Sequence, residues 1–397
     1  MKTYRLALGI VALLLPAIAF SQSYDVVIRG GRVLDPETGL DAVRDIGISN
    51  GKVQKISAEP LAGKRTIAAS GLVVAPGFID LHQHAQDLDS QRVKALDGVT
   101  TALELEIGKP DVAEFLHERE GRSLIHYGTA ASHAAARALA FGNPLPGDQI
   151  LPRSGPATDQ PATAAQMAAI EARMRHEFDA GALAVGMGLQ YTPGATRLEV
   201  IQMFRLAAGR HLPVYTHIRS AGVNEPGSSI EAVEEVIGSA AVSGAPLHIV
   251  HINSSCGGQA PECLGLIAGA RARGLDVTTE AYPYEAGMTA INSALFNPGW
   301  QEKFGVTYGD LMLPETGERL TRKRFELLHN SAKEQLVVMF SNKMANVDGA
   351  ILNPLVMIAS DGEKGHPRNA GTYSRVISRY VRDQRTLSLM DAVRKMS

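Results

Sequence analysis

Ala75-Pro-Gly-Phe-Ile-Asp-Leu-His-Gln-His84 is the stretch on which the interpretation of this sequence depends. The apolar run 72–75 leads through a Pro-Gly pair into a short segment that ends in two histidines, one residue apart. Side chains two positions apart on an extended strand point the same way, so His82 and His84 are expected to converge. Two neutral imidazoles at the end of a strand form half of a metal site, and the other half must come from elsewhere in the chain.

Beyond this stretch the sequence alternates between strand and helix patterns. Helical patterns are clearest at 161–180, 196–210, 229–242 and 260–273. Strand-like apolar runs occupy 72–81, 100–107, 124–130, 182–187, 213–218, 246–251, 275–281 and 355–360. Eight alternations predict an α/β fold, a (β/α)8 TIM barrel over 72–397, rather than an open sheet. The long interval 285–353 is expected to cap the mouth of the barrel.

The residues before the barrel, 22–71, are expected to form a small N-terminal β-layer. Their short strand-like runs are separated by Gly30-Gly31, Asp35-Pro36 and Asn50-Gly51, and the last of these is a strong hairpin signal. The sequence ends at Ser397, directly after a helix-like segment, which leaves these strands few partners. We therefore expect a truncated chain, whose missing C-terminal part would complete a β-sandwich with this layer.

Composition limits the kinds of partner and the location that we expect. The formal net charge is −2, which gives no indication of a nucleic-acid partner. Lys2 and Arg5 precede a short apolar core, and 1–21 is interpreted as a secretory signal peptide. The mature chain is then expected in the periplasm or outside the cell, without a stable membrane span. Cys256 and Cys263 either pair in that oxidising compartment or remain inert.

Side chains suited to a metal stand at the ends of five predicted strands. In barrels of this kind the active residues lie at the C-terminal ends of the strands. Only imidazole and carboxylate groups occur at these ends, and this combination suits Zn²⁺ or another divalent first-row metal. The candidate ligands are His82 and His84 on strand 1, Glu104 and Glu106 on strand 2, His217 on strand 5, His251 on strand 6 and Asp361 on strand 8.

Several longer stretches together carry a resemblance to a known family. They are 26–35, 75–84, 98–101, 181–194, 216–220, 282–287, 360–362 and 366–368, and they span essentially the whole mature chain. The sequence resembles the amidohydrolase superfamily and, within it, the D-aminoacylase (N-acyl-D-amino-acid deacylase) group. This resemblance implies a metal-bearing (β/α)8 barrel with a small β-sandwich, and hydrolysis of the amide bond of N-acyl-D-amino acids.

The sequence departs from that family at the residue that bridges the metals. The predicted strand 182–187 has no lysine, which many superfamily members carbamylate for this purpose. The cysteine that the usual D-aminoacylase has at the end of strand 2 is absent as well. A carboxylate can replace it, so we expect Glu106 to bridge, with Glu104 as the alternative. The Glu-Leu-Glu form resembles the branch named D-glutamate deacylase.

The resemblance and the chemistry of the ligands assign a role to each group. His82, His84 and Asp361 are expected to hold one metal, and His217 and His251 the other, giving one or two Zn²⁺ ions. A metal-bound hydroxide is expected to attack the amide carbonyl, with Asp361 acting first as base and then as acid. A helix N-cap is the alternative role for Asp361.

Three side chains are candidates for binding the substrate, a small N-acyl amino acid with a free carboxylate. Arg368 matches the family's carboxylate-binding arginine, and Tyr284 matches its hydroxyl donor. Arg219 is a further candidate, and an ion pair is the alternative for both arginines. Rival functions are hydrolysis of a cyclic amide, lactone or dipeptide on the same metals, or a catalytically inactive ligand-binding barrel.

Overall fold

The computed structural model describes residues 23–145, 149–331, 333 and 335–397, and the expected signal peptide at 1–21 lies outside this part. Contacts divide the chain into two compact units, one up to Ala75 and one over Pro76–Ser397. Among the described helices, none has both the length and the apolar character needed to cross a membrane. Each unit has its own sheet and its own hydrophobic core.

The N-terminal unit contains the β-layer that the sequence predicts. Its strands lie in the order β3-β2-β1-β4, with β5 also paired to β1. Asn50 and Gly51 join β2 to β3 with φ angles of 54° and 70°, the positive values that a tight hairpin turn requires. Tyr24, Val27 and Leu61 form its small core. The strands are β1 Ser23–Asp35, β2 Leu40–Ser49, β3 Lys52–Ser57, β4 Ala62–Ala68 and β5 Val73–Val74.

One predicted strand is divided between the two sheets. The sequence predicts a single strand over 72–81, but β5 pairs with β1, and the barrel strand β6 begins only at Phe78. Pro76 lacks the N–H that a ladder needs, and a Cβ on Gly77 would clash with Thr100. The Pro-Gly pair therefore ends one strand and starts another, which a continuous apolar run does not reveal.

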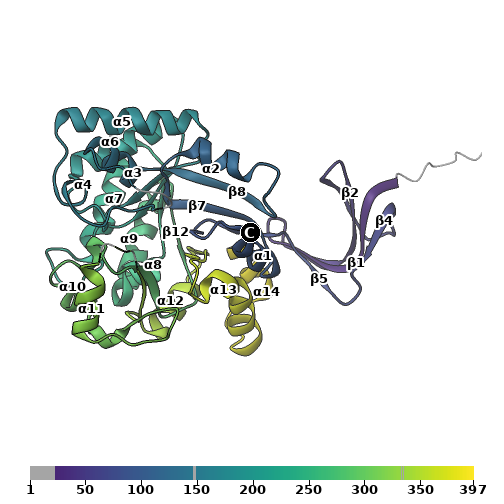
Figure 1. Ribbon diagram of the computed structural model, residues 1–397. Coiled ribbons are helices and arrows are strands. Elements are labelled where there is room, and N and C mark those ends of the chain that lie inside the picture. Colours follow the sequence, from purple (N-terminus) through teal and green to yellow (C-terminus); the bar gives the residue numbers. More distant parts are fainter. Residues whose placement is uncertain (1–22, 146–148, 332, 334) are drawn as a thin grey trace, which may run out of the picture. The chain divides into compact units, whose positions relative to one another are not determined.

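The larger unit contains a nearly closed barrel of eight parallel strands, as predicted (Figure 1). The strands follow one another in chain order, and the end strands β6 and β16 are linked by a bridge between Gln83 and Gly362. The strands are β6 Phe78–Asp80, β7 Val99–Lys109, β8 His126–Ser132, β9 Val185–Gly188, β10 Val214–His217, β11 Leu247–Ile249, β12 Val277–Ala281 and β16 Val356–Ile358.

Helices cover the outside of the barrel and bury one side against its strands (Figure 1). Thr163 and Ser228 form capping boxes at the starts of α5 and α7, and Gly244 ends α7 in the left-handed conformation. Met174 of α5 and Phe204 of α6 lie in the main core. The helices are α1 Leu88–Leu96, α2 Val112–Arg119, α3 His133–Ala140, α4 Pro156–Asp159, α5 Ala164–Asp179, α6 Arg197–Ala208, α7 Ser229–Ser243, α8 Ile252–Ser255, η1 Gly257–Gln259, α9 Ala260–Ala272, α13 Arg368–Val376, the π-helix η4 Ile377–Asp383 and α14 Leu389–Met396.

The interval 285–353 is a folded insertion with its own sheet, in the strand order β13-β15-β14. Phe296, Trp300 and Phe325 lie in its separate core, with ring centroids 5.2 to 5.6 Å apart. Such aromatic packing gives the insertion a fixed shape. Its elements are β13 Gly287–Ala290, η2 Ala294–Phe296, α10 Trp300–Phe304, η3 Tyr308–Asp310, β14 Leu311–Met312, α11 Arg322–His329 and β15 Leu336–Met339. The last helix of the interval, α12 Met344–Leu352, packs instead in the main core of the barrel.

Candidate metal centre

The predicted ligands converge at the C-terminal end of the barrel, as strand ends in this fold do. His82 and His84 follow β6, and Glu106 lies near the end of β7. The last residue of β10 is His217. His251 and Asp361 follow β11 and β16, with φ angles of 31° and 49°. Positive φ is uncommon for residues with a side chain and often marks a functional position.

Glu106 lies at the centre of this group and is buried. Its Oε2 lies 3.0 Å from Nε2 of His82 and 3.2 Å from Nε2 of His84. Its Oε1 lies 2.8 Å from Nδ1 of His217 and 3.0 Å from Nε2 of His251. Each oxygen therefore faces one histidine pair, as a carboxylate between two cations would. Of the two glutamates that the sequence leaves open, the geometry favours Glu106 as the bridge.

Asp361 lies on the side of the centre that holds His82 and His84. Its Oδ1 is 3.5 Å from Nε2 of His82 and 3.3 Å from Nε2 of His84. The ligand atoms within each of three triads lie within 4.8 Å of one another: His82, His84 and Glu106; His82, His251 and Asp361; Glu106, His217 and His251. The structure thus brings these predicted side chains together, and their roles as metal ligands remain predictions.

Carboxylates hold the outward-facing nitrogens of the first histidine pair. Nδ1 of His82 lies 3.0 Å from Oε1 of Glu280, which also accepts the backbone N–H of His251 at 2.7 Å. Nδ1 of His84 lies 2.5 Å from Oε2 of Glu104. Glu104 therefore contacts His84 from outside the group of converging side chains, and its role as the alternative bridge remains a prediction. Glu280 was not predicted, although examining every predicted strand end for carboxylates would have found it at the end of 275–281.

Neutral groups hold the outward-facing nitrogens of the second pair. Nε2 of His217 lies 2.7 Å from the amide oxygen of Gln190. Nδ1 of His251 lies 2.9 Å from the hydroxyl of Ser255. Such outer partners determine which ring nitrogen faces the centre. No sequence pattern indicated either residue, because Gln190 lies in a turn after β9 and Ser255 ends the short helix α8, so neither is on a strand.

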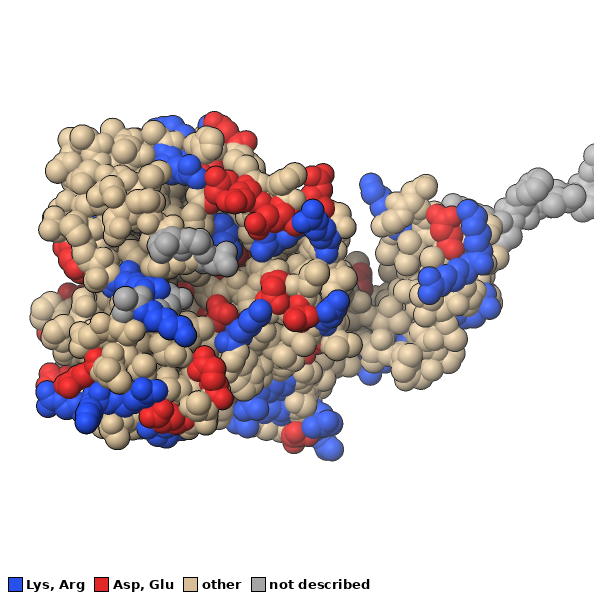
Figure 2. Space-filling view, in the orientation of Figure 1, with Lys and Arg blue, Asp and Glu red and all other residues tan. Residues whose placement is uncertain are grey.

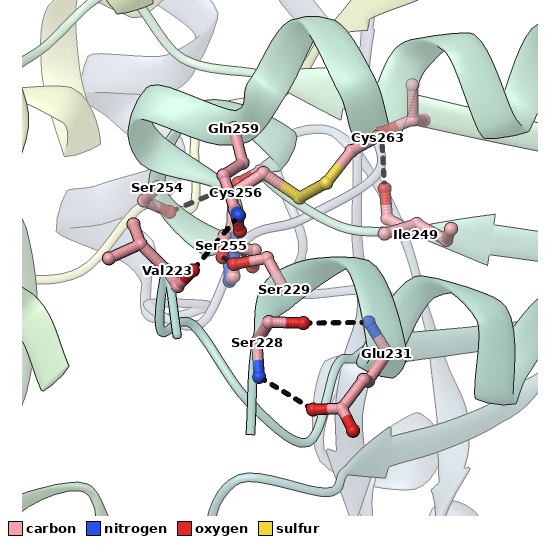
Figure 3. The surroundings of a disulfide bond; sticks show 12 residues. Val223, Ser228, Ser229, Glu231, Ile249, Ser254, Ser255, Cys256, Gln259 and Cys263 are labelled. Carbon is pink, nitrogen blue, oxygen red and sulfur yellow. Dashed lines mark hydrogen bonds between the residues drawn. A yellow bond between two sulfur atoms is a disulfide. The ribbon is translucent and has the colours of Figure 1, made fainter. Parts of the chain in front are cut away.

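A disulfide bond joins Cys256 to Cys263 and closes the turn that follows His251. Figure 3 shows this bond between α8 and α9, with Ser255 directly beside it. Both cysteines are buried. Of the two alternatives that the sequence leaves open, the structure shows pairing, and the bond constrains the segment that carries Ser255.

The pKa values of His82 and His84 shift in the opposite direction from that of His217. Burial acts to lower the pKa of His82 and of His84, but nearby carboxylates, led by Glu106 and Glu104 respectively, raise both well above the ordinary value. Burial lowers the pKa of His217. Burial acts to raise the pKa of Glu106, but the facing histidines, led by His82, lower it well below its usual range. Without a metal, His82 and His84 are therefore protonated more readily than His217.

This donor set fits a divalent first-row metal. Four imidazoles and two carboxylates direct their ligand atoms at one another, and this mixture suits Zn²⁺. Oε2 of Glu280 is buried and has no hydrogen-bond partner among the described residues. Buried negative charge is costly unless it is compensated, and a cation in the centre would compensate it.

A cavity of about 790 Å³ includes the centre in its wall, formed in part by His84, Glu106, His217, His251 and Asp361. Figure 2 shows a hollow in the larger unit with both acidic and basic side chains around it. Much of the remaining wall is apolar and comes from both the barrel and the insertion. Its members include Ile107, Leu151, Tyr191, Leu295, Phe304, Leu336 and Met339.

The structure places the two predicted arginines differently. Arg368 is fully buried, with Nη1 2.7 Å from Oδ2 of Asp361. Arg219 forms two hydrogen bonds with Glu235, at 2.8 and 2.7 Å, and does not belong to the cavity wall. Both arginines therefore form an ion pair and neither is part of the cavity wall, so the substrate-binding roles of Arg368 and Arg219 remain predictions.

Tyr282, rather than the predicted Tyr284, belongs to the cavity wall. The hydroxyl of Tyr284 donates to the backbone carbonyl of Pro367 at 3.5 Å, and its ring packs against His366. Both tyrosines follow the end of β12, where the regular alternation of side chains no longer applies. The Tyr-Pro-Tyr sequence alone therefore could not show which hydroxyl faces the cavity.

Comparisons with known proteins agree with this geometry. No family model matches the chain. It is 27% identical to an N-acyl-D-glutamate deacylase of Alcaligenes xylosoxydans xylosoxydans over 425 residues, which cover 95% of the chain and 82% of that protein. It is also 27% identical to a D-aminoacylase of the same organism, over 95% of the chain and 83% of that protein. Its fold is similar to that of an N-acyl-D-glutamate deacylase from Bordetella bronchiseptica, whose structure was solved in complex with zinc and a phosphonate inhibitor. The TM-score is 0.77 and the sequence identity is 24%, and the match covers 95% of the chain and 85% of that structure.

Proposed function

The chain belongs to the D-aminoacylase group of the amidohydrolase superfamily, and we propose that it hydrolyses the amide bond of N-acyl-D-amino acids in a metal-dependent reaction. One observation carries this proposal. The carboxylate of Glu106 faces a histidine pair with each oxygen, and Asp361 lies beside the first pair in the wall of a large cavity. The histidines and the two carboxylates thus form a centre that can hold a cation next to a bound amide.

Zn²⁺ is the cofactor that this donor set suits best, as one ion or two. His82, His84 and Asp361 would hold it on one side, His217 and His251 on the other, with Glu106 between them. When bound, zinc acts as a Lewis acid toward a carbonyl oxygen and makes water acidic enough to react near neutral pH. The carboxylates of Glu280 and Glu104 keep the rings of His82 and His84 turned toward the cation.

Asp361 is the group that moves protons in this proposal. Burial acts to raise its pKa, but the positive charge of Arg368 holds the pKa well below the usual range of a carboxyl group. Asp361 is therefore ionised at neutral pH and can accept a proton from the attacking water. It then donates that proton to the amide nitrogen as the C–N bond breaks, which releases a carboxylic acid and a free D-amino acid.

Arg368 and Tyr282 are proposed to bind the substrate's carboxylate. The guanidinium carbon of Arg368 lies 4.9 Å from the centre of the Tyr282 ring. A Cβ on Gly287 would lie 3.4 Å from the Tyr282 hydroxyl and 3.9 Å from Nη1 of Arg368. Gly287 belongs to the cavity wall, so its missing side chain leaves both groups close to the space that the substrate enters. Arginine suits a carboxylate because its planar group can donate two parallel hydrogen bonds.

The test is a panel of N-acetyl-D-amino acids, their L-forms and hydantoins, assayed with zinc and after chelation. We expect activity on the D-forms that is lost with the metal, and a kcat that falls about 10² to 10⁴-fold in Asp361→Asn. Tyr282→Phe should raise KM for the D-forms, whereas the matched variant Tyr284→Phe should leave it unchanged.

Preference for the ring substrates would replace deacylation with cyclic-amide hydrolysis on the same centre. An absence of bound metal, together with no gain in rate on adding Zn²⁺, would instead favour an inactive ligand-binding barrel. An equal effect of the two tyrosine variants would remove the proposed carboxylate site and leave the reaction itself in place.

A further inference from the structure

A buried ion pair lies next to the metal centre, outside the set of groups used so far. Lys94 of α1 and Asp80 of β6 are both 0% exposed, and Nζ of Lys94 lies 2.7 Å from Oδ2 of Asp80. Burying two charges costs desolvation, and an apolar pair often stabilises a fold equally well. Such a pair is therefore a candidate for a role other than stability.

Asp80 connects the segments that carry two of the proposed ligands. Its Oδ1 accepts the backbone N–H of His82 at 3.3 Å and that of Ser360 at 3.0 Å. Its Oδ2 accepts the hydroxyl of Ser360 at 2.6 Å. Ser360 directly precedes Asp361, so one carboxylate fixes the backbone at both His82 and Asp361.

These contacts lie where the barrel closes. The end strands β6 and β16 are linked by a bridge at Gln83 and Gly362, and His84 donates its backbone N–H to the carbonyl of Gly362 at 2.9 Å. The side-chain contacts of Asp80 reinforce this short junction. A shift of β16 along β6 would move Asp361 relative to the histidines, and the junction therefore sets their spacing.

Lys94 is linked to the chain both before and after Asp361. Through Asp80 it holds Ser360, and its own Nζ lies 3.5 Å from the backbone carbonyl of Arg368, whose side chain pairs with Asp361. We propose that Lys94 is a positioning residue, which acts through Asp80 to keep His82 and Asp361 at the spacing that binds the metal. This inference rests on the proposed function in one respect, that the centre holds a metal.

The test measures zinc affinity by competition with a chromophoric chelator, and it compares two lysines: Lys94, which is linked through Asp80 to Ser360 after the end of β16, and Lys395, which contacts the start of β16. Lys395 of α14 donates to the carbonyls of Asn353 and Val356, at 2.5 and 2.9 Å, at the start of that strand. We expect Lys94→Met to weaken zinc binding about 10 to 100-fold, the usual effect of losing an outer partner. Lys395→Met should lower thermal stability and leave zinc affinity unchanged.

Ser360→Ala keeps the inference testable if Lys94→Met does not fold. It removes the hydroxyl that lies 2.6 Å from Oδ2 of Asp80 and also within 3.3 Å of the carbonyl of His82 and Oε1 of Gln83. We expect it to weaken zinc binding in the same direction by about 10-fold. Unchanged zinc affinity in Ser360→Ala and in folded Lys94→Met would overturn the proposal, as would an equal loss in Lys395→Met. A selective loss in a protein that hydrolyses no N-acyl-D-amino acid would support Lys94 as a positioning residue while the proposed function fails.

Discussion

The two histidine pairs on either side of Glu106 contain the same kind of side chain but differ in what supports them. His82 and His84 have carboxylates behind them, Glu280 and Glu104. Behind His217 and His251 lie an amide oxygen and a hydroxyl. The same ligand type is therefore placed in two electrostatic settings within one site.

From this difference we infer that the His82–His84 side and the His217–His251 side bind a metal under different conditions. Carboxylates raise the pKa values of His82 and His84 above the ordinary value, although burial opposes this, and a metal must displace protons to bind there. Burial lowers the pKa of His217, so that ring is already neutral at pH 7. We expect the first zinc ion to bind on the His217 side.

Removing the bridge should have the largest effect, because it acts on both sides at once. Glu106→Gln replaces a charged ligand that faces all four histidines with a neutral amide. We expect zinc affinity and kcat/KM to fall by more than the ~100-fold that the loss of an outer partner costs. Zinc content after dialysis and steady-state kinetics measure this.

Glu104→Gln is the matched control, because it makes the same change two positions away on β7. Oε1 of Glu104 accepts the backbone N–H groups of Ile107 and Gly108, and His84 is the only one of the four histidines that its side chain hydrogen-bonds. We therefore expect a loss of about 10 to 100-fold, confined to the first side. If Glu104→Gln removed both zinc ions and Glu106→Gln removed neither, the assignment of the bridge would be reversed.

The pH dependence of metal binding should separate the two sides. Because the pKa values of His82 and His84 are raised, raising the pH removes protons that compete with the metal, and binding on that side tightens. Each proton displaced contributes up to about 10-fold in affinity per pH unit. We therefore expect the second zinc equivalent to bind about 10 to 100-fold more tightly at pH 8 than at pH 6. Calorimetric titrations in two buffers of different ionisation enthalpy count the protons released.

The first zinc equivalent is the internal control for that titration. The pKa of His217 is lowered by burial, so protons compete with the metal less at this ring than at His82 and His84. The first equivalent should then bind with a much weaker pH dependence. Equal proton release for both equivalents would show that the outer carboxylates do not distinguish the two sides.

The fold and the central ligands could be predicted because both follow from local rules. Buried parallel strands appear in the sequence as apolar runs, and a barrel brings the residues at their C-terminal ends together. His82, Glu106 and Asp361 meet for this reason, although nearly three hundred positions separate the first from the last. To predict this meeting, it was enough to identify which residues stand at the C-terminal ends of the strands.

The carboxylates behind the first pair lie at strand ends, but the neutral partners of the second pair, Lys94 and the choice between the two tyrosines could not be predicted in this way, because they depend on side-chain directions in three dimensions. Lys94 lies on a helix whose sequence is mostly polar, and nothing in it distinguishes a buried lysine from a solvated one. Tyr282 and Tyr284 differ only in how the chain turns after β12. Gln190 lies in a turn whose shape depends on the surrounding loops. The sequence therefore indicated the candidate ligands but not most of the groups that orient them.

The smallest effect in this comparison should come from Ser255, the neutral partner of His251. Ser255→Ala removes one hydrogen bond from Nδ1 of His251 and leaves the net charge unchanged. A hydrogen bond of this kind contributes about 1 kcal/mol, so we expect the first zinc equivalent to bind about fivefold more weakly. The second equivalent, on the His82 side, should be unaffected.

Ser254→Ala is the control for this variant, because the Ser254 hydroxyl donates to the backbone carbonyl of His251 at 3.1 Å and does not contact its ring. It should leave zinc affinity unchanged if the ring contact is what matters. The disulfide at Cys256 holds the segment next to Ser255 and limits how far His251 can move once its partner is lost, which is why the expected loss is small. A loss in Ser255→Ala as large as that in Glu104→Gln would mean that a neutral partner orients its histidine as strongly as a charged one, and the two sides would then differ in their protons alone.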